Sequence, residues 1–272
     1  MLRAAWLLLR RVRAFVARDF QLAVSYRLEF FMRVLMILLM VTTFYFVSKI
    51  FTGGVTDFTQ WRNPLAAWVT GLAVLNYFMT GFSSLANAIR SEQMQGTLES
   101  VLLSPISVPT VVVASSAWDL LLATFHSSLY FIFGWLFFGV EFRGNFLLAL
   151  LFLLLTTLVL ACFGILSASF AMVFKRGDPF ALLLGTGSAL FSGVFFPTQL
   201  LGPVFGTISR LLPSTYGLDG IRRVLIEGQG LAEVKEPLIT LFIFLAVLLP
   251  FSLWVFSRAV RRAKREGSLI QY

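Results

Sequence analysis

Residues 90–105 read RSEQMQGTLESVLLSP, a polar stretch that separates two apolar segments, each long enough to cross a lipid bilayer. A transmembrane helix needs about 20 largely apolar residues. The polar stretch therefore forms a hinge outside the membrane, where another protein could act on the two spans. Gly96 ends one helix, Thr97 can begin the next, and Pro105 stops it, which predicts a short amphipathic helix suited to a groove on a partner protein.

The composition around this hinge is that of an integral membrane protein. Hydrophobic residues make up 58% of the 272 positions, and charged residues only 13%, whereas a soluble domain is about 25% charged. We expect a single all-α domain with six transmembrane helices over residues 30–257. The predicted spans are residues 30–51, 65–88, 115–140, 146–174, 180–201 and 237–257.

The distribution of basic residues predicts the orientation. Six spans place both termini on one side, and a cytoplasmic placement leaves 15 of the 22 Lys and Arg residues inside. This agrees with the positive-inside rule and predicts a multi-pass protein of the inner or plasma membrane. The net charge of +9 is then explained by basic residues that contact anionic membrane lipids. No nucleic-acid partner is needed to account for it.

Both ends of the chain carry basic residues next to the spans. Residues 1–29 have apolar side chains three or four positions apart with arginines beside them, which predicts a cytoplasmic helix lying in the lipid headgroups. This helix acts either as a lipid anchor or as a relay of force to the spans. Residues 258–272 form a basic cytoplasmic tail.

The loop between spans five and six, residues 197–236, is long and rich in glycine and proline. Loops of this length usually carry function or are disordered. Two apolar pieces, residues 204–212 and 216–226, favour re-entrant helices that dip into the outer leaflet and form an outer gate. The alternative is a surface cap that folds over the bundle.

Polar residues inside the spans are candidates for a transport pathway, because charged groups are costly within a membrane. Asp119 and His126 lie seven residues apart in the third span, and Asn76 and Tyr77 lie in the second. Each has an alternative structural reading: Asp119 could be a helix cap or a coupling contact, and the other three could bond to neighbouring helices.

Small residues four apart, Gly185, Ala189 and Gly193, lie on the fifth predicted span. Such a pattern permits close approach of two helices. It predicts a helix-packing seam, either between two copies of the chain or within one copy.

No catalytic or metal-ligating set can be assembled, because the sequence holds one histidine and one cysteine. We therefore expect no enzyme activity in this chain. The sequence leaves two alternatives to an energy-coupled permease: a proton- or ion-coupled carrier that uses Asp119 and His126 as a relay, and a membrane scaffold that transports nothing.

Two motifs resemble those of type-2 ATP-binding-cassette (ABC) exporter permeases. The first is Gly-Thr-Leu-Glu at 96–99 followed by Leu-Leu-Ser-Pro at 102–105, and the second is Leu-Pro-Ser-Thr-Tyr at 212–216 followed by Gly-Ile-Arg-Arg at 220–223. Six spans, an interfacial N-terminal helix and a broken outer loop extend this resemblance over nearly the whole chain.

The resemblance implies a permease that works as a homodimer, or as a heterodimer with a related permease. Each copy would dock on a separate ATP-binding cassette subunit that binds ATP and Mg. The chain itself has no phosphate-binding Gly-x-x-x-x-Gly-Lys-Ser/Thr motif, so we expect no cofactor on it. The family contact region corresponds to Glu92, Gly96, Thr97, Leu98, Glu99 and Pro105.

Overall fold

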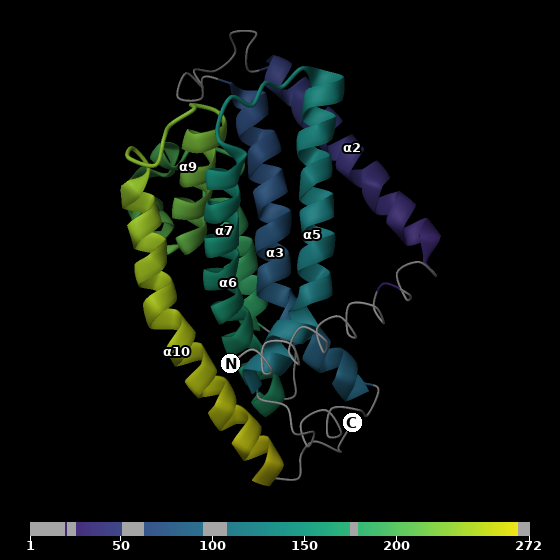
Figure 1. The fold of residues 1–272 in the computed structure, drawn as a ribbon, viewed down its shortest axis with the longest axis vertical. Coiled ribbons are helices and arrows are strands. Elements are labelled where there is room, and N and C mark those ends of the chain that lie inside the picture. Colours follow the sequence, from purple (N-terminus) through teal and green to yellow (C-terminus); the bar gives the residue numbers. More distant parts are fainter. Residues whose placement is uncertain (1–19, 21–25, 51–62, 95–107, 175–178, 266–272) are drawn as a thin grey trace.

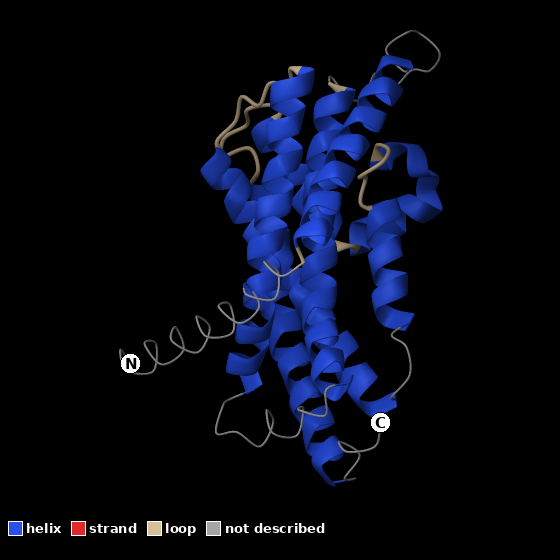
Figure 2. Cartoon of the chain, turned by 90° about the vertical axis from the view of Figure 1, so that its right-hand side faces the viewer, coloured by secondary structure: helices blue, strands red, loops and turns tan. Residues whose placement is uncertain are grey.

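The computed structural model describes residues 20, 26–50, 63–94, 108–174 and 179–265 (Figure 1). This part of the chain consists of helices joined by short loops (Figure 2). It contains eight α-helices and one 3-10 helix, η2. Their bounds are α2 Arg27–Ile50, α3 Pro64–Met94, α5 Val108–Phe138, α6 Phe146–Phe174, α7 Pro179–Phe191, η2 Thr198–Leu201, α8 Gly202–Leu211, α9 Pro213–Leu225 and α10 Lys235–Arg265.

Five of the described helices are long and apolar enough to cross a membrane, which confirms an all-helical membrane fold. The apolar spans are Arg27–Ile50, Pro64–Ser84, Trp118–Phe138, Phe146–Phe170 and Lys235–Arg262. They coincide with five of the six predicted segments. At a rise of about 1.5 Å per residue, each reaches across a hydrocarbon core of about 30 Å.

Polar side chains fix where two of these helices begin. Asn63 Oδ1 accepts a hydrogen bond from the backbone N–H of Ala66 (3.1 Å) ahead of the apolar run of α3. Asn145 Oδ1 accepts one from the backbone N–H of Leu147 (2.9 Å) at the start of α6. These bonds satisfy N–H groups that have no partner within their own helix.

The fifth predicted span, residues 180–201, is not one continuous helix. Helix α7 has 13 residues and ends at Phe191, which corresponds to about 20 Å of helix. Gly193 follows with a φ of 83°, in the left-handed region that glycine favours. We call residues 192–197 the α7 break. The chain resumes as η2 after this break, so the described residues do not form a sixth long helix.

The long loop predicted over residues 197–236 contains two short helices, α8 and α9, close to the two apolar pieces seen in the sequence. Each has a proline in its first turn, where the missing N–H group has no intrahelical partner to lose. Helix α9 is the more buried of the two and contacts α3, α6 and α10. This loop is therefore part of the packed bundle.

The core lies between α3, α6, α9 and α10. Its largest buried side chains include Phe78 of α3, Phe152 of α6, Leu218 and Ile221 of α9, and Leu241 of α10. Helix α3 lies between α5 and α6, whereas α2 and α10 lie on opposite flanks of the bundle (Figure 1). Along helix α2, only Ile37, Val41 and Ser48 are buried.

The ends of α3 and α5 that flank the predicted hinge lie at the opposite end of the bundle from helix α9. The last turns of α3 and the first turns of α5, which flank residues 95–107, are at the lower end in Figure 1. Helix α9 is at the upper end. The basic C-terminal end of α10 lies at the same lower end as these turns of α3 and α5.

Candidate functional site

The predicted contact region for an ATP-binding subunit falls mostly outside the described residues. This applies to Gly96, Thr97, Leu98, Glu99 and Pro105. Glu92 belongs to the last turn of α3. The interfacial helix predicted over residues 1–29 also lies almost entirely outside, although the structure shows that α2 begins at Arg27.

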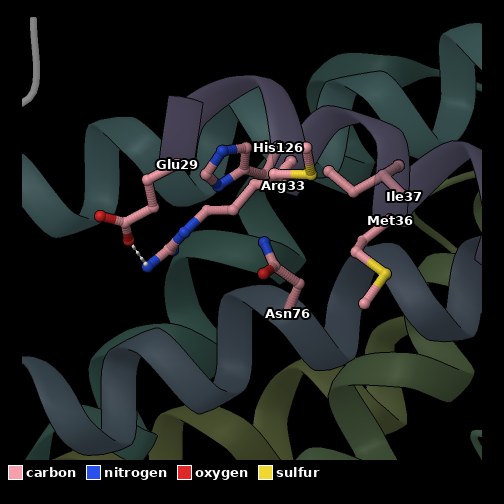
Figure 3. Close-up of a pocket in the computed structure, with 7 residues that line it drawn as sticks. Glu29, Arg33, Met36, Ile37, Asn76 and His126 are labelled. Atoms are coloured by element: carbon pink, nitrogen blue, oxygen red, sulfur yellow. Dashed lines mark hydrogen bonds and ion pairs between the residues drawn. The ribbon is translucent and has the colours of Figure 1, made fainter. Parts of the chain in front are cut away.

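A cavity of about 320 Å³ lies between α2, α3 and α5, and we call it the α2 cavity (Figure 3). It contains two of the predicted pathway residues, Asn76 from α3 and His126 from α5. The remaining lining comes from one side of α2: Glu29, Met32, Arg33, Met36 and Ile37. Two residues separated by 50 positions in sequence thus meet at one site, which the sequence alone did not predict.

Asn76 joins the α2 cavity to the contact between α3 and α5. Its Nδ2 group donates to Ser127 Oγ (3.3 Å) and to the backbone carbonyl of Ala123 (3.5 Å). Ser127 Oγ in turn donates to the backbone carbonyl of Ala73 (2.7 Å). Ser127 also lines a second cavity of about 250 Å³ between α3, α5, α6 and α9. This polar link therefore separates two cavities in the same bundle.

Tyr77 is placed differently from its neighbour Asn76. Its hydroxyl lies 2.9 Å from Thr124 Oγ1 on α5, and its side chain is buried. Successive helical residues point about 100° apart, so adjacent positions reach different surroundings. Tyr77 therefore contributes to the packing of α3 on α5 and is not among the residues that line the α2 cavity.

His126 is almost fully enclosed, with 4% of its surface exposed. Its Nε2 atom is buried and has no hydrogen-bonding partner among the described residues. The ring contacts Phe125 edge-on at 5.8 Å. Asp119, on the same helix, is partly buried and does not line the α2 cavity. The structure therefore does not bring the two predicted relay residues into one cavity.

The three small residues of the predicted seam do not share one helix. Gly185 and Ala189 belong to α7, but Gly193 lies in the α7 break. A Cβ atom on Gly185 would lie 3.3 Å from Met79 Sδ, so this position packs on α3 of the same chain. A seam between two copies stays a prediction.

Arg222 on α9 belongs to the second motif quoted from the sequence, but the sequence analysis did not select it as a site residue. Its guanidinium donates to the backbone carbonyls of Gly193 (2.7 Å), Val194 (3.3 Å) and Ala67 (2.8 Å). Trp68 Nε1 donates to the carbonyl of Phe195 (2.8 Å). Two side chains thus bind the carbonyl groups of the α7 break and attach it to α3 and α9.

Arg222 is also a cation at the C-terminal end of α7, where the helix dipole favours positive charge. An arginine side chain keeps its proton in proteins, so the guanidinium is charged at neutral pH. The available sequence signal was a charged residue within a segment expected to enter the membrane.

Glycines bring α9 close to α6 beside this arginine. A Cβ atom on Gly217 would lie 2.1 Å from Thr156 Oγ1, and one on Gly220 would lie 2.3 Å from Phe152 Cε1. Gly71 allows a less close approach on α3, since its Cβ would lie 2.9 Å from the Val194 carbonyl oxygen and 3.0 Å from the Arg222 guanidinium. Helix α9 therefore packs on α6 through two positions that tolerate no side chain.

Comparison with protein families gives a match over residues 10–226 to the family described as ABC-2 type transporter. The chain belongs to this family. The match extends from before α2 to just beyond α9, and so includes the hinge, the α7 break and Arg222. Membrane domains of ABC-2 transporters lack ATPase activity and typically bind no cofactor. The search of curated proteins found no match.

Proposed function

We propose that this ABC-2 membrane domain is the permease subunit of an ATP-driven exporter. The observation that carries the proposal is the family match over residues 10–226, which includes the predicted hinge. A separate ATP-binding cassette subunit would bind ATP and Mg. It would contact the hinge through Glu92 and residues 96–105, and closure of the cassettes would move α3 and α5.

The proposal includes a second permease copy, identical or related, with the substrate path formed by the pair. Two features of the described residues support a gate at the outer end. Helix α7 is too short to cross a membrane alone, and α8 and α9 complete its packing. We propose that α7, the α7 break and η2 together form the fifth of six crossings, with α8 and α9 as a re-entrant outer gate.

The coupling role is tested by reversing the charge at the hinge with Glu99→Lys. We expect ATP-driven transport in proteoliposomes to be lost, while membrane insertion and hydrolysis by the co-purified ATPase persist. Glu236→Lys is the control, because Glu236 is an exposed residue in the first turn of α10. Transport that continues without any ATPase and collapses with the proton gradient would support an ion-coupled carrier and contradict this proposal.

The orientation is tested independently. A labelled tag after Tyr272 should react in inside-out membrane vesicles and stay protected in intact cells, because the basic end of α10 is retained on the cytoplasmic side. A tag inserted after Gly228, in the loop between α9 and α10, should show the reverse pattern. Labelling of both tags from the same side would refute the six-crossing topology.

A further inference from the structure

We propose that the α2 cavity binds the head group of a zwitterionic phospholipid that enters sideways from the inner leaflet. This concerns lipid binding by the chain itself, so it holds or fails independently of the ATP-binding partner. It uses the orientation proposed above. Three observations carry it: the opening of the cavity, the ion pair at its polar end, and the enclosed imidazole in its wall.

The cavity opens toward the bilayer, because most of its α2 wall consists of exposed side chains, with Ile37 as the buried exception. Met32 is 47% exposed and Met36 is 65% exposed, on a helix whose length and hydropathy fit a membrane span. The volume of about 320 Å³ is at the lower end of ligand pockets, which range over roughly 300–1,000 Å³. It therefore holds a head group and the start of a chain, while the acyl chains lie along exposed residues such as Leu39.

The polar and apolar groups along α2 follow the order of a lipid molecule. Glu29 and Arg33 lie near the first turns of the helix, at the proposed headgroup level, and Met36 and Ile37 come one turn deeper. Figure 3 shows the Glu29–Arg33 pair at one end of the cavity and Met36 with Ile37 at the other. An amphipathic ligand can match both ends at once.

The ion pair selects for a head group that carries both charges. Arg33 and Glu29 are 2.9 Å apart, and both side chains are 60% exposed, so an entering ligand can reach them. A zwitterion offers its phosphate to Arg33 and its ammonium group to Glu29, which leaves neither residue unpaired. An anionic head group would place its phosphate beside the Glu29 carboxylate, and like charges repel.

The deeper wall offers hydrogen bonds to the ester region of the lipid. His126 lines the cavity and has no hydrogen-bonding partner among the residues that the structure describes. Buried polar groups in proteins are nearly always hydrogen-bonded. An imidazole N–H group can donate a hydrogen bond to a glycerol ester carbonyl of the lipid. The Asn76 amide lies in the same wall of the cavity.

Lipid titration of the delipidated full-length chain, followed by native mass spectrometry, tests the proposal. The probes are dioleoyl phosphatidylethanolamine, dioleoyl phosphatidylglycerol and dioleoylglycerol. We expect the zwitterionic lipid to bind about tenfold more tightly than the other two. A hydrogen bond to a charged group is stronger than a neutral one by roughly the free energy that corresponds to a tenfold change in affinity. Equal binding of the three lipids would overturn the proposal.

Two charge variants sharpen this test. Glu29→Gln leaves Arg33 without its carboxylate, so the preference should shift from phosphatidylethanolamine to phosphatidylglycerol. Arg33→Gln should lower phosphatidylethanolamine binding by about tenfold without a gain for phosphatidylglycerol. Arg143→Gln is the matched control, because it breaks a similar ion pair with Glu141 (2.6 Å) in the loop between α5 and α6. An unchanged preference in Glu29→Gln would overturn the assignment.

Two further measurements separate a lipid from other occupants. His126→Phe should weaken phosphatidylethanolamine binding several-fold, and Asn76→Leu provides a second variant if His126→Phe does not accumulate. A photoreactive amino acid at Met36 should give an adduct of lipid mass in native membranes. Cross-linking to a second copy of the chain would instead show that a protein surface covers the cavity, and would overturn the proposal.

Discussion

Replacing Arg222 by leucine should lower the free energy of unfolding by about 3–5 kcal/mol. The substitution leaves the carbonyls of Gly193, Val194 and Ala67 without their donors, and each buried group that loses its partner costs about 1–3 kcal/mol. It also removes the positive charge from the C-terminal end of α7. Thermal unfolding of the purified chain in detergent measures the loss.

The neighbouring arginine provides the control for this variant. Arg223 pairs with Asp219 at 2.9 Å, and its side chain is 39% exposed. Arg223→Leu should therefore cost no more than about 1 kcal/mol, as exposed ion pairs do. Arg222→Lys should fall between the two, because lysine keeps the charge but cannot reproduce the planar fork of donors. Equal stability of the Arg222→Leu and Arg223→Leu variants would contradict the role given to Arg222.

Leucine at Gly217 or Gly220 should prevent α9 from seating on α6. A Cβ atom alone would lie 2.1 Å from Thr156 Oγ1 at the first position and 2.3 Å from Phe152 Cε1 at the second. Overpacking by a few methylene groups already costs about 1–3 kcal/mol, and here a whole side chain has no space. We expect little monodisperse protein on size-exclusion chromatography and a lower melting temperature for any that is recovered.

Gly206→Leu is the matched control, since it makes the same substitution in the adjacent helix α8. Among the described residues, no atom beyond the backbone of its own helix and its two chain neighbours lies within 4 Å of the Cβ position at Gly206. This variant should be recovered in wild-type yield. A yield as low as that of Gly217→Leu would mean that leucine is harmful anywhere in the outer segment, which would contradict the packing argument.

The sequence predicted the helical segments well because length and hydropathy are local properties. Five of the six predicted spans are found as long helices. The α7 break escaped prediction because residues 192–197 include Val194, Phe195 and Phe196, so that hydropathy does not distinguish them from a transmembrane helix. The bonds that hold the break come from Arg222, 29 residues beyond Gly193, and from Trp68 at the start of α3. The two partners of each bond are too far apart in sequence for a local hydropathy analysis to detect the contact.

The candidate site was predicted in part. Asn76 and His126 were selected as polar residues within spans, and both line the α2 cavity. Tyr77 was selected on the same grounds, although its hydroxyl meets Thr124 on α5. Hydropathy identifies which segments cross the membrane but not which helices become neighbours. The meeting of α2 with α3 and α5, and hence the contribution of Glu29 and Arg33, required the structure.

The hydrogen bonds to the carbonyl groups of the α7 break affect whether a metal cation could bind there. In many ion-coupled carriers, the backbone carbonyls of an interrupted helix serve as ligands for Na⁺. Here the carbonyls of Gly193, Val194 and Phe195 already accept hydrogen bonds from Arg222 and Trp68. A fixed guanidinium beside them also repels a metal cation. These contacts disfavour sodium binding at the interruption of α7, which is bonded instead to α3 and α9.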